Sequence, residues 1–373
     1  MTQIERGNRI AKKVFDGFDS LHIKSGKPII RSNGIAEWTV LASIIAEIED
    51  EILPITITTG VKALPDSVRN YSQGRIVHDS HAEILSIRLF NWYLLEECSK
   101  LKQDESYISK LVETSDDNKF KLKESVCLSL LITEPPCGDA SMVKLINESE
   151  NSEIWSDIQP NKRIKLDTMR GRSDFGKLGI VRTKPGRSDS IPTLSKSCSD
   201  KLCLKQITGL TNPFTFDLFP NGVYLDNLIL KKDNYTTEDI DRCFKTRIKS
   251  WDESIHSLKV IEYDISDFKY AKDNDKLPSP LSLLYLPQSK STQVLNNGVK
   301  NGSYIKNKPP KKGGESFISN YGLYIKMASF QNLPYKSYIE FKKSNKQREK
   351  LKQQSKQLLG NWIHTSEDNF QFS

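Results

Sequence analysis

The 373-residue sequence lacks an apolar stretch that could cross a membrane, because its most apolar part, 38–48, is far shorter than the about 18 residues of a spanning helix. Residues 1–6 also lack the basic and then apolar pattern of a secretory signal peptide. We therefore expect a protein of the nucleus or the cytoplasm. Six irregularly spaced cysteines are too few for a disulfide framework, so we expect them to be thiols or metal ligands.

The charge balance is moderately basic, with 55 Lys and Arg against 47 Asp and Glu, a formal net charge of +8. Such a surplus favours a polyanionic partner, but a soluble and slightly basic surface would show it too. Two segments are rich in lysine, 306–312 and 336–357. Each is either a contact for RNA phosphates or simply a solvated segment.

The pattern of apolar residues predicts a mixed α/β core with helices packed on a sheet. We expect helices at 4–21, 82–97, 200–207 and 336–357, a further helix from 139 toward 147, a strand pair at 37–48 and 51–61, and strands at 126–132 and 260–265. Residues 147–197 are polar and poorly periodic, which predicts a long insertion, and 292–314 are expected to form a loop.

Three short motifs contain residues that bind metals: His81-Ala82-Glu83, Pro136-Cys137-Gly138 and Ser197-Cys198-Ser199-Asp200-Lys201. Each is weak alone, but each stands where a helix is expected to begin, and helix N-termini favour thiolates. One histidine and two cysteines suit a catalytic zinc ion, which keeps a fourth position open for water. Glu83, two residues after His81, would then move protons instead of binding the metal.

Several alternatives remain open at this point. The pattern H-x-E followed by P-C-x-x-C is typical of zinc nucleobase deaminases, but position 140 is alanine and the next cysteine is Cys198. A cytidine deaminase is therefore disfavoured, though its zinc chemistry is the same. The three residues could also be unrelated buried side chains. A catalytically silent RNA-binding subunit with a structural zinc is disfavoured by Glu83 and by the presence of only three evident ligands.

Five longer segments, 78–84, 136–140, 181–184, 197–201 and 359–363, resemble motifs that occur in this order in the adenosine deaminases acting on RNA. The resemblance extends from about residue 37 to the end. Within the family the chain resembles the tRNA-specific branch. Only 36 residues precede the similar region, too few for a double-stranded-RNA-binding domain, and Lys184 stands only 14 positions before Cys198. That short connection suits a base that is already unpaired.

The resemblance implies a cytidine-deaminase-like α/β domain at 37–373, with 1–36 as a helical extension packed on it. It implies that His81, Cys137 and Cys198 bind Zn²⁺ and that Glu83 is the proton shuttle while hydroxide attacks C6 of adenine. The implied product is inosine, and the implied substrate is adenosine 37 of tRNA-Ala. The matching pocket positions are Val40, Val61 and Lys62. The sequence shows no sign of an obligate protein partner.

The resemblance further implies a buried inositol hexakisphosphate, whose charge requires inward-pointing cations and polar donors. The positions that match its binding residues are Arg88, Lys201, Tyr338, Lys342 and Trp362. Asp79, Lys184 and Lys201 match a polar relay between this cofactor and the zinc. Two family arginines are replaced by Ile87 and Leu204, and a third by Ser141, so details of both sites are expected to differ.

Overall fold

The computed structural model describes residues 1–143, 146, 176–184, 193–251 and 255–372. Its helices are α1 (Gln3–Asp19), α2 (Arg69–Ser72), α3 (Ala82–Gln103), α5 (Cys198–Thr208), α6 (Thr237–Phe244), α7 (Asn320–Ala328), α8 (Tyr338–Ser344) and α9 (Lys346–Leu359). Its strands are β1 (Glu37–Trp38), β2 (Leu41–Ile48), β3 (Glu51–Pro54), β4 (Ile57–Thr59), β5 (Val61–Ala63), β6 (Asp79–His81), β7 (Val112–Ser115), β8 (Lys119–Leu122), β9 (Val126–Ile132), β10 (Asn227–Lys231), β11 (Lys259–Tyr263), β12 (Leu277–Pro278), β13 (Leu281–Leu286), β14 (Ser291–Asn296) and β15 (Val299–Lys300).

A mixed nine-stranded sheet forms the centre of the molecule, in the order β11-β10-β9-β2-β4-β13-β14-β15, with β3 paired to β2. The strands β9, β10 and β11 are parallel, and the others run antiparallel to their neighbours. This arrangement confirms the predicted α/β class. Among the described residues, no helix is long and apolar enough to cross a membrane.

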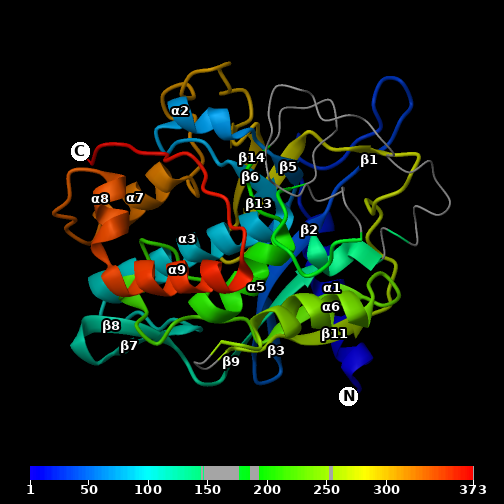
Figure 1. The fold of residues 1–373 in the computed structure, drawn as a ribbon, viewed down its shortest axis with the longest axis horizontal. Coiled ribbons are helices and arrows are strands. Elements are labelled where there is room, and N and C mark those ends of the chain that lie inside the picture. The colour runs from blue at the N-terminus through cyan, green and yellow to red at the C-terminus, as the bar shows by residue number, and fades with distance from the viewer. Residues whose placement is uncertain (144–145, 147–175, 185–192, 252–254, 373) are drawn as a thin grey trace.

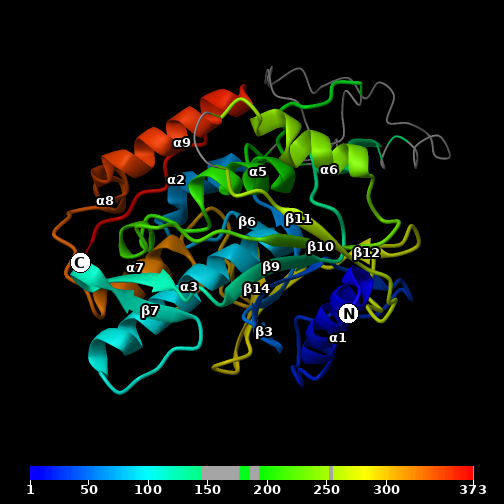
Figure 2. The same ribbon diagram turned by 90° about the horizontal axis from the view of Figure 1, so that it is seen from below.

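Strand β2 shows how the sheet separates two apolar layers. Alternate side chains of a strand point to opposite faces, and Leu41 and Ile45 pack with helix α1, whereas Ala42, Ile44 and Ala46 pack with α3. Figure 2 shows α1 below the strands and α5, α6 and α9 above them. Both faces of the sheet are therefore covered.

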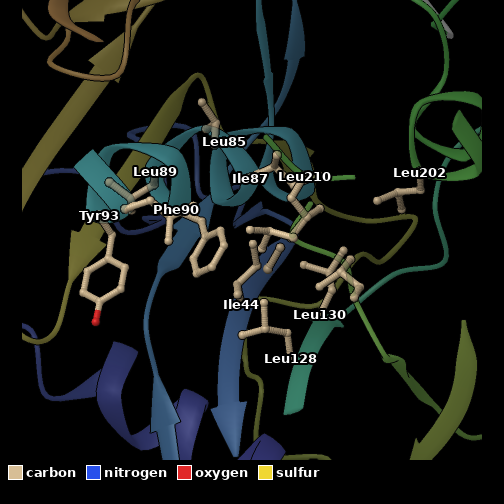
Figure 3. Close-up of a cluster of buried hydrophobic side chains, with 14 of the residues drawn as sticks. Ile44, Leu85, Ile87, Leu89, Phe90, Tyr93, Leu128, Leu130, Leu202 and Leu210 are labelled. Carbon is tan, nitrogen blue, oxygen red and sulfur yellow. The ribbon is translucent and has the colours of Figure 1, made fainter. Parts of the chain in front are cut away.

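Helix α3 packs its apolar face on strands β2 and β9. Figure 3 shows Phe90 on the side of α3 that faces Ile44, whereas Leu85 lies on the opposite side of the helix. All of these side chains are buried, so α3 is packed against the core on more than one side. The first turn of this helix carries Glu83, so the core packing of α3 fixes the position of that carboxyl group.

Helix α1 lies directly on strand β11. Its side chains Ile10, Val14 and Phe18 are fully buried in the layer below the sheet. Gly7 is in close contact with the strand, because a Cβ atom there would lie 1.9 Å from the backbone oxygen of Glu262. Thr2 begins the helix with a capping box that includes the Glu5 side chain.

The last described residues return to the segment before β6. Asp368 is buried and accepts hydrogen bonds from Ser72 Oγ at 2.9 Å and from the backbone N–H of Gly74 at 2.7 Å, and its Oδ2 lies 2.9 Å from His78 Nε2. Phe370 packs over Gly74 and stacks on Tyr338 of helix α8. The segment thereby joins α8 to the chain that leads into β6.

Several sequence predictions for individual elements differ from the structure. The expected strand pair at 37–48 and 51–61 is divided, into β1 and β2 in the first segment and β3 and β4 in the second. The expected loop at 292–314 instead begins with β14 and β15, because pairing with β13 overrides a composition rich in Lys, Asn and Gly. The expected helix at 336–357 is two helices, separated at Asn345, whose side chain caps α9. The expected helix after residue 139 begins as a 3-10 turn, Asp139–Ser141.

Most of the insertion predicted near 147–197 lies outside the described residues. This insertion and the division of the chain at residue 36 therefore stay predictions.

Candidate active site

Three separate elements carry the predicted metal ligands to one place. His81 ends strand β6, where it pairs with Val61 of β5. Cys137 follows strand β9 after a short turn. Cys198 begins helix α5, which is capped by Ser197. The backbone N–H of Cys198 donates a hydrogen bond to Cys137 Sγ at 3.4 Å, so the two cysteines are neighbours although 61 positions separate them in the sequence.

The imidazole of His81 is oriented by Asp79. Asp79 Oδ1 lies 3.0 Å from His81 Nδ1 and accepts the backbone N–H of His81 at 3.1 Å. This contact leaves Nε2 free to face the cysteines, and the ring is in hydrogen-bond contact with the Cys137 thiol. A carboxylate at Nδ1 is the usual partner of a metal-binding histidine, because it fixes the tautomer and the ring orientation.

Lys184 stands between the two thiols and Asp79. Its Nζ lies 2.6 Å from Cys198 Sγ, 3.7 Å from Cys137 Sγ and 3.4 Å from Asp79 Oδ2. The side chain of Lys184 is fully buried, and an ammonium in that position favours thiolate over thiol. Lys184 therefore supplies positive charge at the point where the two sulfur atoms converge.

Asp79 also connects this group to Lys201. Its Oδ2 accepts hydrogen bonds from Lys201 Nζ and, at 3.1 Å, from Ser195 Oγ. Burial alone would raise the pKa of Asp79, but Lys184 and Lys201 outweigh it and hold that pKa well below its ordinary value. The three residues predicted as a relay thus form one continuous chain of ionic contacts.

Glu83 is buried, with 3% of its surface exposed, in the first turn of α3. Its charge acts on both Lys184 and Cys198, which places the carboxyl group within electrostatic range of the thiols. Glu83 follows His81, the residue before the first turn of α3, by two positions. This is the position expected for a group that exchanges protons with a molecule held beside the sulfur atoms.

The site has the donors for a metal but not a finished metal geometry. Among the described residues, no three His, Cys, Asp or Glu side chains already stand as a set that could hold an ion. The chemistry of the donors nevertheless fits zinc: one imidazole with Nδ1 engaged, and two sulfur atoms beside a cation. The ammonium of Lys184 lies close to one sulfur, where it partly neutralises the negative charge that a metal cation would neutralise.

The three predicted pocket residues lie next to this site. Val61 is opposite His81 in the β5–β6 pair, and Lys62 follows it with an exposed side chain. Val40 is partly buried, and its carbonyl accepts the N–H of Gly60 at 3.1 Å.

Above helix α5, basic side chains gather between helices α5, α8 and α9. Figure 1 shows α9 lying along α5, with α8 at its end. Burial lowers the pKa of Lys352 to about 6, and the cations Lys342, Arg348 and Lys356 lower it as well, while Glu349 offsets only part of this effect. An excess of partly buried cations is costly unless an anion neutralises it. These residues fit a bound polyanion.

Several of the positions predicted to bind a polyanion lie beside this cluster, and their role stays a prediction. Lys342 is one of its members, Lys201 acts on Lys196, and Trp362 lies near both Lys196 and Lys356, with each ammonium about 6 Å from the ring. Tyr338 is buried and interacts electrostatically with Arg88. Arg88 itself donates to the carbonyl of Ile318 and to Asn320 Oδ1.

The sequence did not predict five cations of this cluster: Lys196, Lys205, Arg348, Lys352 and Lys356. Burial, followed by Arg348, lowers the pKa of Lys205 to about 7, and its Nζ donates to the carbonyl groups of Leu210 and Thr211. A signal was present in helix α9, where Arg348, Lys352 and Lys356 recur every fourth residue and so share one face.

Several known proteins are similar to this chain. The chain is 36% identical over 385 residues to "tRNA-specific adenosine deaminase 1" of Schizosaccharomyces pombe, covering 98% of this chain and 97% of the relative. It is 34% identical over 382 residues to the protein of the same name from Saccharomyces cerevisiae, covering 97% and 94%. A "Double-stranded RNA-specific editase Adar" of Drosophila melanogaster is 29% identical over 184 residues, covering 47% of this chain and 26% of the relative.

A family model for the adenosine-deaminase (editase) domain matches residues 56–366, which include every one of the predicted metal ligands and Glu83. This match and the near full-length similarity to the two yeast proteins show that the chain belongs to the adenosine-deaminase (editase) domain family.

Proposed function

We propose that this enzyme hydrolyses the 6-amino group of adenosine in tRNA, giving inosine and ammonia, and that adenosine 37 of tRNA-Ala is its target. The observation that carries the proposal is the convergence of His81, Cys137, Cys198 and Glu83 from three separate segments of the chain. The relatives that match nearly the whole chain are both named for deamination of tRNA adenosine. The choice of position 37 rests on the sequence resemblance.

The residues proposed to hold zinc are His81, through Nε2, and the sulfur atoms of Cys137 and Cys198. Zinc bound there supplies a water molecule of lowered pKa, so that hydroxide is available near neutral pH. Asp79 keeps a proton on Nδ1 of His81 and so keeps Nε2 available as a ligand. Lys184 stabilises the thiolate form that a metal requires.

Glu83 is proposed to carry the protons of the reaction. Its carboxylate takes a proton from the attacking water and delivers protons to the purine ring and to the departing amine. The Glu83 side chain is buried in the first turn of α3, which limits the exchange of that proton with bulk water. Val40 and Val61 are proposed to contact the base, and Lys62, exposed at the edge of the site, to contact a phosphate of the substrate.

The basic cluster of α5, α8 and α9 is proposed to bind inositol hexakisphosphate, whose negative charge would neutralise the cations there. Lys201, Lys342, Tyr338, Trp362 and Arg88 are the ligands expected from the resemblance, and Arg348 and Lys352 are added because of their position in the cluster. The contacts from Lys201 through Asp79 to Lys184 support a relay between this cluster and the thiols.

The proposed reaction is tested with purified protein and transcribed tRNA-Ala, read out base by base for inosine. Glu83→Gln should keep the fold and the bound zinc but lose turnover by at least about 100-fold, since general acid–base catalysis contributes roughly 10²–10⁴. A transcript with guanosine at position 37 is the substrate control. Retained turnover in the Glu83→Gln variant would contradict the proton role.

The same assay separates the alternatives. Cytidine-containing substrates test a cytidine deaminase, and uridine as the only product would replace the adenosine proposal. A folded, zinc-containing protein that produces no inosine in any tRNA, but binds tRNA, would instead support the silent RNA-binding subunit.

A further inference from the structure

Each metal-binding cysteine is followed, two residues later, by a buried aspartate. Asp139 follows Cys137 and Asp200 follows Cys198, and both carboxylates are completely inaccessible to solvent. Asp139 contacts Arg242 of helix α6, and Asp200 contacts Arg247 of the short 3-10 helix Thr246–Ile248, which follows α6.

A single guanidinium group, that of Arg247, contacts both carboxylates. Its Nη2 lies 2.7 Å from Asp200 Oδ1, and its Nη1 lies 3.7 Å from Asp139 Oδ2. The side chain of Arg247 is 4% exposed, so these are contacts in the interior. The two nitrogen atoms of the fork therefore connect two turns whose cysteines are 61 positions apart in the sequence.

Arg242, one turn earlier on α6, holds the first of these turns a second time. Its Nη2 donates to the backbone carbonyl of Asp139 at 2.6 Å, and its Nε lies 3.3 Å from Asp139 Oδ1. Asp239 keeps this guanidinium in place from the preceding turn. Backbone N–H groups complete the arrangement, with Gly179 donating to Asp139 Oδ1 at 2.8 Å and Arg182 to Asp200 Oδ2 at 2.9 Å.

The separation of two thiolates around one zinc ion is a tight requirement, since each Zn–S bond is about 2.3 Å long. Near the sulfur atoms, helix α5 and the turn after β9 are joined by the Cys198 N–H contact and by Ser199, whose backbone N–H and Oγ both donate to the carbonyl of Cys137, at 3.1 and 2.8 Å. On the other side of the two turns, the planar guanidinium of Arg247 is hydrogen-bonded to Asp200 and in ionic contact with Asp139, so it constrains their separation at a second point.

We propose that Arg247, supported by Arg242, is a positioning residue that fixes the spacing of Cys137 and Cys198 and thereby sets the affinity of the zinc site. This inference rests on the proposed function for the presence of zinc. Both arginines act through the carboxylates of Asp139 and Asp200, which follow the two cysteines.

The test compares wild type with Arg247→Lys and Arg247→Met. Lysine keeps the positive charge that the buried carboxylates need but cannot span both of them. Arg6→Met is the matched control, because Arg6 forms a comparable two-point ion pair with Glu47, with Nε at 2.7 Å and Nη2 at 2.8 Å, and lies far in sequence from Cys137 and Cys198. Thermal unfolding, zinc affinity by chelator competition, and the visible absorption of the Co²⁺-substituted protein are measured for each.

Arg247→Lys should remain folded, bind zinc about 10- to 100-fold more weakly, and show an altered Co²⁺ spectrum, as is typical when a group supporting metal ligands is lost. Arg6→Met should lose stability but keep the zinc affinity and the Co²⁺ spectrum of wild type. The separation of the two effects would establish the positioning role.

The inference is overturned if Arg247→Lys folds and binds zinc as tightly as wild type with an unchanged Co²⁺ spectrum. It is also overturned if both Arg247 variants fail to fold, because Arg247 would then support the whole fold and not the cysteine spacing. A wild-type protein that binds no zinc at all would instead contradict the metal assignment of the proposed function, and the inference with it.

Discussion

At the scale of single residues, Gly138 shows how closely the two cysteine-bearing segments approach. Its φ of +101° with a ψ of −142° is a conformation that only glycine adopts without strain. A Cβ atom at this position would lie 2.3 Å from Ser197 Oγ, the residue that caps helix α5. Glycine is therefore required both by the backbone and by the neighbouring segment.

Gly138→Ala should lower the free energy of unfolding by more than the roughly 1–3 kcal/mol of backbone strain, and it should also reduce zinc binding, because the clash pushes Cys137 and Cys198 apart. Gly179→Ala is the matched control, since Gly179 also has a positive φ, +72°, but nothing lies within 4 Å of its added Cβ. Chemical denaturation and zinc content measure both effects. Equal behaviour of the two variants would contradict this account.

The site residues differ in how far the sequence could predict them. His81, Glu83, Cys137 and Cys198 lie in short motifs whose spacing left alternatives open, and the family resemblance implied their roles. The structure brings the four residues together, and their roles stay a prediction. Arg247 was not predicted, because its contacts with two aspartates depend on the folded position of the 3-10 helix Thr246–Ile248. A lone arginine in a segment rich in charge carries no local signal of that kind.

At the scale of elements, helix α1 was predicted from its apolar periodicity, but its distance from the sheet was not. The close approach at Gly7 depends on the carbonyl of Glu262, which a periodic pattern does not contain. Strands β13 and β14 were missed for the related reason that they are stabilised by pairing partners distant in sequence.

Gly7→Ala should destabilise the protein by about 1–3 kcal/mol, although alanine is the better helix former, because the methyl group would push α1 away from β11. Gly17→Ala in the same helix is the control. Its Cβ would meet only the flexible end of Ile57, at 3.0 Å, so its stability should stay equal or rise slightly. Urea denaturation of both variants measures the difference, and a stabilised Gly7→Ala variant would show that α1 is not held this closely.

At the scale of the whole molecule, the cations of α5, α8 and α9 predict how stability depends on pH. A lysine has an ordinary pKa of 10.5, but in the anion-free fold burial first, and then the neighbouring cations, lower the pKa of Lys352 to about 6. The pKa of Lys205 is lowered to about 7, again by burial and then by Arg348. Between these values and 10.5 the unfolded chain binds more protons than the folded one, so stability rises with pH in this window.

Without the anion, the melting temperature should therefore rise as the pH is increased from about 6.5 to about 9. With inositol hexakisphosphate present, the lysines stay protonated beside phosphate, so the melting temperature should be higher and the pH dependence weaker. Uncharged myo-inositol is the control. Identical pH profiles with and without the hexakisphosphate would contradict a polyanion site among these helices.

The α/β class and the membership of the deaminase family were predicted from sequence, and both are confirmed. The extent of the basic cluster was not predicted. A lysine-rich sequence such as that of α9 is equally compatible with a solvated helix and with a helix packed over α5. Only packing decides which face of such a helix is buried.

The contacts of the last residues bear on the rate of folding. Ser366 bonds to Asp66 and Asp368 bonds to Ser72, and these partners are 300 and 296 positions apart in the chain. Closing loops of that length is entropically expensive and comes late in folding. During synthesis, His78 and the strand that carries His81 leave the ribosome long before Asp368 does. The segment beside the active site therefore acquires its final contacts only after nearly the whole chain has been made.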